Sequence, residues 1–222
     1  SLNILNLGVK HKLNRIFIPS SIAVWGPDCP KHAPQETALH PTTMYGVTKV
    51  SGEVLGEYYF NKFGLDVRGL RYPGIISSET LPGGGTTDYA VAIYYGAVTD
   101  NHYNCFVKED TRLPMMYMPD CIKASIDLLQ APIENLKHHT DFNVGSMSFD
   151  VKSLADSIKK YKPEFTIKYN PDFRQKIADS WPQSVDDSAA RKEWNWSPEY
   201  DLDAMTKDML EKLEKKHKEG KI

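Results

Sequence analysis

The chain has 222 residues, of which 41% are hydrophobic and 25% charged, proportions typical of a globular protein that buries a core. A net charge of -2 without a basic cluster argues against nucleic-acid binding, and no apolar run approaches the ~20 residues of a membrane span. Cys29, Cys105 and Cys121 are odd in number and far apart, which favours a reducing compartment over a disulfide framework and predicts no zinc or other metal site.

The first third of the chain alternates between helix-like and strand-like segments. Its predicted elements are a helix over residues 2–13, a strand over 15–19, a proline-rich loop over 23–43, a helix from Thr42 to about Phe63 and a strand over 66–72. Gly64 is expected to end the long helix as its C-cap. A strand, a long connection with a helix and a second strand form the crossover unit of a parallel sheet.

The remainder continues the alternation. Predicted helices cover about 89–98, 121–130, 151–161, 173–181, 187–194 and 202–216, and predicted strands cover 113–118, 142–145 and 165–169. No internal repeat or low-complexity segment interrupts these elements. The order of strands and helices therefore places the chain in the α/β class.

Tyr45 and Lys49 form the pattern around which the candidate chemistry gathers. They are four residues apart, so on a helix they lie on one face, one turn from each other. An ammonium beside a phenol stabilises the phenolate, which can act as a general base. Such a pair alone more often marks a solvated helix face. Here strand ends also bring Ser20-Ser21 and Pro73-Gly74 toward it, and that constellation is more specific.

A glycine-rich stretch, Pro82 to Asp88, precedes the predicted helix over 89–98. It lacks the G-x-G-x-x-G spacing and the Walker lysine and does not directly follow a strand, so phosphate binding is not predicted. Thr86, Thr87 and Asp88 are candidates for helix capping, and a helix N-terminus also attracts a carboxylate. The capping and ligand-binding interpretations are equally weighted and compatible.

With these motifs placed, the chain resembles the extended short-chain dehydrogenase/reductase family and, within it, the branch of short-chain type L-threonine 3-dehydrogenases. The segments that carry the resemblance are 19–27 (PSSIAVWGP), Tyr45-x-x-x-Lys49, 71–77 (RYPGIIS), 82–90 (PGGGTTDYA), 113–120 (LPMMYMPD), 180–182 (SWP) and 200–202 (YDL). The resemblance covers essentially the whole chain and is specific, because unrelated motifs agree in order.

The resemblance implies a doubly wound, Rossmann-type parallel sheet with a small C-terminal substrate-binding subdomain. Residues 1–75 would form the C-terminal part of the NAD-binding Rossmann domain, and residues 76–222 mainly the substrate-binding subdomain, with 113–145 returning to the Rossmann sheet. The family's N-terminal strand–G-x-x-G-x-x-G–helix unit is not in this sequence. We therefore expect the chain to start inside the Rossmann domain, and a targeting region would lie outside it.

The implied reaction is NAD-dependent oxidation of L-threonine to 2-amino-3-oxobutyrate. Tyr45 would take the hydroxyl proton, Lys49 would support the phenolate, and Ser20 or Ser21 would donate to the reacting oxygen. The implied cofactor-binding residues are Tyr45, Lys49, Pro73, Gly74 and Ile75. The implied substrate-binding residues are Ser20, Ser21, Tyr45, Thr86, Asp88 and Trp181, with a core position as the alternative for Trp181.

Two other functions fit the same scaffold. A nucleotide-sugar epimerase or dehydratase is the second choice, although the segment after Ile75 is short and lacks an obvious basic residue for a diphosphate. A non-catalytic binding protein is the third.

The expected partners follow from the resemblance. The family commonly uses the Thr42–Phe63 helix in a two-fold dimer, and Gly46, Gly52 and Gly56 suggest close helix packing, so a homodimer is predicted. Functional coupling to a 2-amino-3-oxobutyrate CoA ligase is also expected. The compartment would be cytoplasmic in a bacterium and mitochondrial in a eukaryote.

Overall fold

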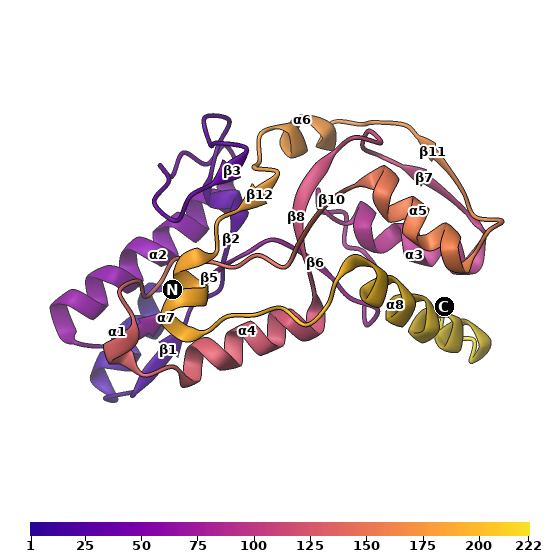
Figure 1. The fold of residues 1–222 in the computed structure, drawn as a ribbon. Helices are drawn as coiled ribbons and strands as arrows, with labels where there is room; N and C mark the ends of the chain where they lie inside the picture. The colour runs from indigo at the N-terminus through magenta and orange to yellow at the C-terminus, as the bar shows by residue number, and fades with distance from the viewer.

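The computed structural model describes residues 1–222, which form two groups of elements lying side by side (Figure 1). The helices are α1 (Leu2–Lys10), α2 (Met44–Phe63), α3 (Tyr89–Thr99), α4 (Met118–Gln130), α5 (Val151–Tyr161), α6 (Arg174–Asp179), α7 (Ser188–Trp194) and α8 (Leu202–Lys218). Short 3₁₀ turns are η1 (Ile22–Val24) and η2 (Ile133–Asn135). None of the helices has the length and apolar character that crossing a membrane requires.

The strands are short and fall into several ladders. They are β1 (Arg15–Phe17), β2 (Ser20–Ser21), β3 (His32–Ala33), β4 (Asp66–Arg68), β5 (Leu70–Tyr72), β6 (Gly74–Ile76), β7 (His102–Cys105), β8 (Arg112–Tyr117), β9 (Phe142–Asn143), β10 (Met147–Asp150), β11 (Thr166–Tyr169) and β12 (Ser184–Val185). The segment 66–76 supplies three of them in succession, β4, β5 and β6.

The first group of elements is a parallel sheet covered by helices on both faces. β1 pairs with β4, and β5 lies between β2 and β9, all in parallel register. One face packs against α1 and α2 through a cluster that includes Leu5, Tyr59 and Val67. The opposite face packs against α4 and α7 through a cluster that includes Leu70 and Trp194. This is the doubly wound, Rossmann-type arrangement that the sequence predicted.

The second group begins where the chain leaves this sheet. β6 pairs in parallel with β8, and β8 pairs antiparallel with β10, while β7 and β11 form a separate parallel ladder. The largest hydrophobic cluster fills this part and brings α3, α5 and α8 together. Pro73, which has no N–H to donate to a ladder, separates β5 from β6. The chain therefore changes sheets at Pro73.

The predicted division of the chain at residue 75 falls within β6. β8, which the prediction assigned to the Rossmann sheet, pairs only with strands of the second group. α4 and β9, which follow β8 in the chain, lie in the first group, where Leu128 and Phe142 enter its core. The chain crosses between the two groups several times, so their boundary is not a single point in the sequence.

α2 has well-defined ends. Thr43 is its N-cap, and its side-chain oxygen accepts a hydrogen bond from the Gly46 N–H at 3.0 Å. Gly64 ends the helix in the left-handed conformation with a φ of 65°, which confirms the predicted C-cap. Both ends are thus fixed by local interactions that can be read from the sequence.

The small residues of α2 face the interior of the same chain. A Cβ on Gly46 would lie 2.1 Å from the Ala23 carbonyl oxygen, and one on Gly56 would lie 2.6 Å from a methyl carbon of Thr140. The interpretation of these glycines as a dimer-packing face is therefore wrong. They allow α2 to approach the η1 turn and its own sheet closely. The apolar residues exposed on the helix lie elsewhere, at Val47, Val54 and Tyr58.

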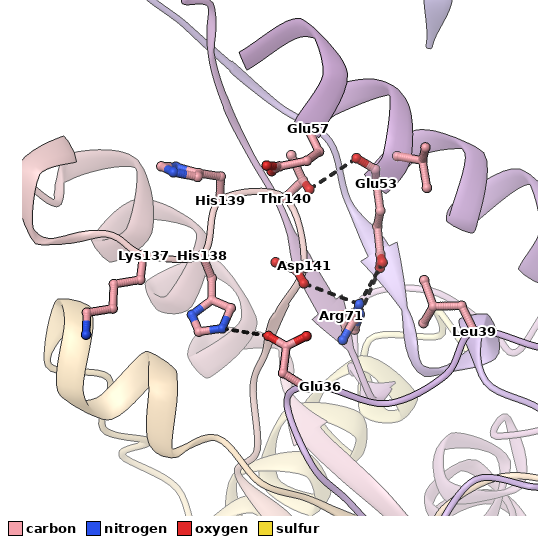
Figure 2. A pocket seen from close by; sticks show the side chains of 11 residues that line it. Glu36, Leu39, Glu53, Glu57, Arg71, Lys137, His138, His139, Thr140 and Asp141 are labelled. Atoms are coloured by element: carbon pink, nitrogen blue, oxygen red, sulfur yellow. Dashed lines mark hydrogen bonds and ion pairs between the residues drawn. The ribbon is translucent and has the colours of Figure 1, made fainter. Parts of the chain in front are cut away.

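The long loop between β2 and α2 is ordered by contacts with distant segments. Its strand β3 pairs with β12, and the Gln35 side chain bonds to the backbone of Asp141 and Asn143 at 2.7 and 2.9 Å. Glu36 lies 3.1 Å from Nε2 of His138 (Figure 2). Nδ1 of the same histidine lies 2.7 Å from Glu193 of α7. His138 therefore joins the loop to α7.

The strength of the contact of His138 with Glu36 and Glu193 depends on the protonation of the imidazole. Burial disfavours its charged form, but the Glu193 carboxylate, helped by Asp141 and Glu36, more than offsets that effect and raises the pKa of His138 above its ordinary value. A charged imidazolium is accordingly favoured by the folded state. Since the folded state binds this proton more tightly than the unfolded chain, the contact stabilises the fold most at low pH.

We expect the Gly46→Ala substitution to destabilise the full-length gene product by about 1–3 kcal/mol, because the added methyl group meets backbone atoms that cannot move independently. Gly83→Ala is the matched control, since nothing lies within 4 Å of a Cβ at Gly83. Urea denaturation of the two variants measures the difference. Equal midpoints for both would contradict the close packing of α2 described above.

We expect His138→Gln to lower stability at acidic pH and to have less effect as the pH rises. The stabilisation by His138 is fully present below the ordinary histidine pKa of about 6.5 and is lost as the pH rises through the higher folded-state value. The measurement is the free energy of unfolding of both proteins from about pH 6 to pH 9. His11→Gln, at an exposed position, is the control. A difference that does not vary with pH would refute the assignment.

Candidate active site

A cavity of about 390 Å³ opens where the parallel strands of the first sheet end and the chain crosses to the second. Its lining residues are Ser21, Ile22, Thr43, Tyr45, Pro73, Gly74, Gly85, Thr86, Thr87, Ile177 and Trp181. They come from the end of β2, the start of α2, the β5–β6 junction, the loop before α3, and α6 with the residues after it. Ligands of α/β proteins bind in this position, outside the carboxyl ends of parallel strands.

Tyr45 lies in the first turn of α2, and 55% of its surface is exposed. Its hydroxyl makes no hydrogen bond within the chain, although the ring lines the cavity. Lys49, one turn later, has its Nζ 5.3 Å from the centroid of the Tyr45 ring. The Lys49 Nζ also donates a hydrogen bond to the Pro19 carbonyl at 2.8 Å. Of the three ammonium protons one is engaged, which leaves donors for a ligand.

The two adjacent serines of β2 point to opposite sides, as neighbours on a strand must. Ser20 is 3% exposed, and its hydroxyl donates to the buried carboxylate of Glu53. Ser21 lines the cavity, and its oxygen accepts a hydrogen bond from the Ala23 N–H at 3.2 Å. The Ser21 O–H remains free to donate toward the cavity. Ser20, which the sequence left as an equal candidate, is turned away from the site.

Pro73 and Gly74 form the part of the wall between β5 and β6. A Cβ on Gly74 would lie 2.4 Å from the Met115 sulfur and 3.0 Å from the Thr87 side chain, so the absence of a side chain lets these segments close together. Ile75 pairs with Met116 in the β6–β8 ladder and does not line the cavity. Its expected contact with a cofactor was through the backbone, and that contact remains a prediction.

Thr86 and Thr87 line the cavity, and their hydroxyls have no hydrogen-bond partner within the chain. Asp88 lies just behind them, and its Oδ2 accepts hydrogen bonds from the N–H groups of Gly84 and Gly85, both at 2.8 Å. The carboxylate therefore holds the glycine loop in place. It makes no hydrogen bond to the first turn of α3, so the expectation that the Asp88 side chain caps this helix is wrong. The Oδ1 of Asp88 makes no hydrogen bond.

α6 and the residue pair after it close the cavity opposite the strand ends. Trp181 is half-buried and lines the cavity, as one of its two predicted positions required, and it also packs against the hydrophobic clusters. Ile177, one helical turn before Trp181, contributes to the same wall. Together they make this side of the cavity apolar.

Sequence reasoning left five lining residues, Ile22, Thr43, Gly85, Thr87 and Ile177, out of the predicted site. Ile22, Thr43 and Gly85 lie next to or near predicted residues in the chain, so proximity would have found them. Thr87 was weighed for capping and for ligand binding alike, but only its neighbours Thr86 and Asp88 were chosen as site residues. Ile177 lies more than a hundred residues from Tyr45, and only its spacing of four from Trp181 indicated it. No group of three or more His, Cys, Asp and Glu side chains is placed to hold a metal ion.

The site thus offers several polar groups with unused hydrogen-bonding capacity around a cavity of small-molecule size. Tyr45 and Ser21 can each bond to an oxygen atom of a ligand in the cavity. Lys49, whose Nζ lies 5.3 Å from the centroid of the Tyr45 ring, is not itself among the lining residues. The geometry suits removal of a proton from a hydroxyl group, or delivery of a proton to a carbonyl oxygen.

A family model and a curated relative each match more than half of this chain. A sequence model described as the NAD dependent epimerase/dehydratase family matches residues 1–145. The mitochondrial L-threonine 3-dehydrogenase of Bos taurus is 47% identical over 210 residues, which are 94% of this chain and 56% of that protein. The chain thus spans little more than half the length of this relative.

Solved structures agree with the sequence comparison. The L-threonine dehydrogenase from Phytophthora infestans is 54% identical with a TM-score of 0.95, covering 97% of this chain and 70% of that one. A monomeric L-threonine 3-dehydrogenase from a metagenome database is 48% identical with a TM-score of 0.93, covering 96% and 69%. These matches confirm the predicted fold and the resemblance to the extended short-chain dehydrogenases/reductases: the chain belongs to the NAD dependent epimerase/dehydratase family.

Proposed function

We propose that the protein containing this chain catalyses NAD-dependent oxidation of L-threonine to 2-amino-3-oxobutyrate. The observation that carries the proposal is the meeting of the Tyr45 phenol, the Ser21 hydroxyl and the threonine pair 86–87 on one cavity, with the Lys49 ammonium 5.3 Å from the tyrosine ring. The names of relatives at about half identity support the same substrate.

The residues of this chain fit one end of a nicotinamide cofactor. Tyr45 presents an unpaired hydroxyl, and Lys49 has unused ammonium protons. Pro73 and Gly74 form part of the cavity wall, while Ile75 lies outside the lining and would reach a cofactor through its backbone. These residues would hold the nicotinamide ribose and carboxamide. When bound, NAD supplies the acceptor for the hydride that leaves the threonine Cβ.

In the proposed reaction Tyr45 is the general base. Its phenolate oxygen accepts the proton of the threonine hydroxyl, and the adjacent Lys49 stabilises the anionic phenol by Coulomb attraction. Ser21 donates its O–H to the same substrate oxygen and so fixes its position beside Tyr45. The bond of Lys49 to the Pro19 carbonyl keeps the ammonium at this end of α2.

The amino-acid end of the substrate would lie against the loop before α3. Thr86 is the proposed donor to the substrate carboxylate, and the free Oδ1 of Asp88 is the proposed acceptor for its ammonium. Trp181 and Ile177 supply an apolar wall for the methyl group.

A nucleotide-sugar substrate is less well supported. Its diphosphate would require positive charge, and neither lysine nor arginine is among the residues that line the cavity. A purely non-catalytic role would give no reason for the meeting of the tyrosine, Ser21 and the threonine pair on one cavity.

For partners, we propose a homodimer in which α2 meets its symmetry mate. Val47, Val54 and Tyr58 are 45%, 60% and 51% exposed on this helix, and a shallow hollow lined by Pro41, Val47, Val50, Ser51, Val54 and Leu55 follows the same face. Such an apolar strip on a 20-residue helix suits an isologous contact. One relative is described as monomeric, so the oligomeric state must be measured.

The reaction also suggests a cellular setting. The product, 2-amino-3-oxobutyrate, would be consumed by a 2-amino-3-oxobutyrate CoA ligase, with which functional coupling is proposed. The proposed compartment is the cytoplasm in a bacterium and the mitochondrion in a eukaryote; the bovine relative is named as mitochondrial.

The full-length gene product is expected to form NADH from L-threonine and NAD, and to turn over L-allo-threonine, L-serine and UDP-galactose much more slowly. Tyr45→Phe should lower kcat by about 10²- to 10⁴-fold with the fold intact, because the general base is lost. NADH absorbance measures turnover, and circular dichroism checks the fold. If the wild-type protein binds NAD but turns over UDP-galactose in preference to L-threonine, the threonine proposal is wrong. Undiminished turnover by Tyr45→Phe would refute the role of Tyr45 as the general base.

A charged residue on the outer face of α2, Val54→Glu, should convert a dimer into a monomer, because like charges would meet across a desolvated two-fold contact. Light scattering of the full-length gene product gives the mass. Ile122→Glu on α4, also about half exposed, is the control and should leave the mass unchanged. A monomeric wild-type protein would refute the homodimer.

A further inference from the structure

Glu53 continues the spacing that connects Tyr45 and Lys49. The three residues stand four apart on α2, so they form one stripe along the helix. Their exposure differs strongly, since Tyr45 is 55% exposed and Glu53 only 4%. A carboxylate so deeply buried must be paired to be tolerated.

The carboxylate of Glu53 has three hydrogen-bond donors. Arg71 donates from Nε to Oε1 at 3.0 Å and from Nη2 to Oε2 at 2.8 Å, which is a two-pronged ion pair (Figure 2). The hydroxyl of Ser20 donates to the same Oε1. Ser20 and Arg71 are 3% exposed each and face each other in the β2–β5 ladder.

These bonds attach α2 to the strand that carries Ser21. Lys49 bonds to the carbonyl of Pro19 at 2.8 Å, and Glu53 accepts from Ser20, the next residue. Because side chains alternate along a strand, holding Ser20 against α2 directs Ser21 to the opposite side, where the cavity lies. The rotation of β2 is thereby fixed with respect to the helix that carries Tyr45.

Glu53 does not compete as a base. Its charge is balanced by Arg71, whose remaining donors reach the Gln35 carbonyl at 3.0 Å, Asn143 at 3.3 Å and Asp141 at 3.5 Å. Glu53 is absent from the lining of the reaction cavity and borders instead a separate cavity of about 350 Å³ (Figure 2). Its influence on a reaction must pass through Ser20.

We infer that Glu53 is a positioning residue for the reaction at Tyr45, acting through its hydrogen bond from Ser20, which sets the separation between the Ser21 hydroxyl and the Tyr45 phenol. The expected effect on kcat rests on the proposed function. The expected effect on the distance between Ser21 and Tyr45 rests on geometry alone. A displacement of about 1 Å between two groups that act on the same atom can cost as much as 100-fold in rate.

Ser20 is the sharper position to change. Replacing Glu53 would leave Arg71 buried without its partner and endanger folding. Ser20→Ala removes a single hydrogen bond and keeps the ion pair, whereas Ser20→Thr retains a hydroxyl. Ser157→Ala is the matched control, because Ser157 is also 3% exposed and bonds one side chain, Thr206 at 3.0 Å, within the second group of elements.

In the full-length gene product, Ser20→Ala should lower kcat for L-threonine by about 10- to 100-fold, with KM changed less than about twofold and NAD affinity unchanged. Ser20→Thr should restore most of kcat. Ser157→Ala should lose similar stability without a fall in kcat. Wild-type kcat in Ser20→Ala, or an equal fall in Ser157→Ala, would overturn the inference.

A crystal structure of Ser20→Ala tests the placement itself and needs no turnover. The distance from the Ser21 oxygen to the Tyr45 hydroxyl oxygen should differ from that of the wild-type protein. An unchanged distance would overturn the inference. Absence of threonine turnover in the wild-type protein would instead refute the proposed function, and this structural comparison would then decide the role of Glu53.

Discussion

The buried ion pair between Glu53 and Arg71 is the constraint on which the arrangement of the site depends. Removing two charges from water is costly, and a buried pair is tolerated only when its geometry is good and its other hydrogen bonds are made. Here Arg71 bonds to Glu53 twice and uses its remaining donors on Gln35, Asn143 and Asp141. The helix α2, the strands β2 and β5 and the loop around Gln35 must all be in place to satisfy it. The pair therefore selects one arrangement of these segments, whatever its net contribution to stability.

Residues on a single face of α2 therefore have two different roles, one toward a ligand and one toward the interior of the protein. At the open end of α2, Tyr45 and Lys49 keep hydrogen-bonding capacity that the chain does not use. One turn further on, Glu53 is fully engaged inside the protein. A group that contacts a ligand must be accessible, whereas a group that fixes two segments rigidly must be buried. One residue cannot satisfy both requirements. The spacing of four residues lets one helix supply both.

What the sequence could predict was set by how local each feature is. The ends of α2 depend on Thr43 and Gly64, which act within a turn, and both can be read from residue type. The alternation of Ser20 and Ser21 was predictable, but which one faces the cavity depends on Glu53 and Arg71, which are distant in the chain. Glycines at 46, 52 and 56 indicated a close approach without indicating of what, and the approach is to the η1 turn and the sheet of the same chain. Ile177 reaches the cavity through the tertiary fold, and its spacing of four from Trp181 is the one local pattern that indicates it.

Two cavities of similar size are present, one lined by the ion pair and one at Tyr45, and size does not distinguish them. The cavity in Figure 2 holds more charged residues, yet most of them bond to one another: Arg71 is fully occupied, and His138 lies between Glu36 and Glu193. The cavity at Tyr45 holds few charges, but the hydroxyls of Tyr45, Thr86 and Thr87 have no partner in the chain and Ser21 has a proton to donate. A ligand gains hydrogen bonds from donors and acceptors that are not already bonded to other groups of the protein. The cavity of Figure 2 also has unpaired groups, the Lys137 ammonium and Nδ1 of His139, but it lacks the cluster of unpaired hydroxyls that supports the proposed site at Tyr45.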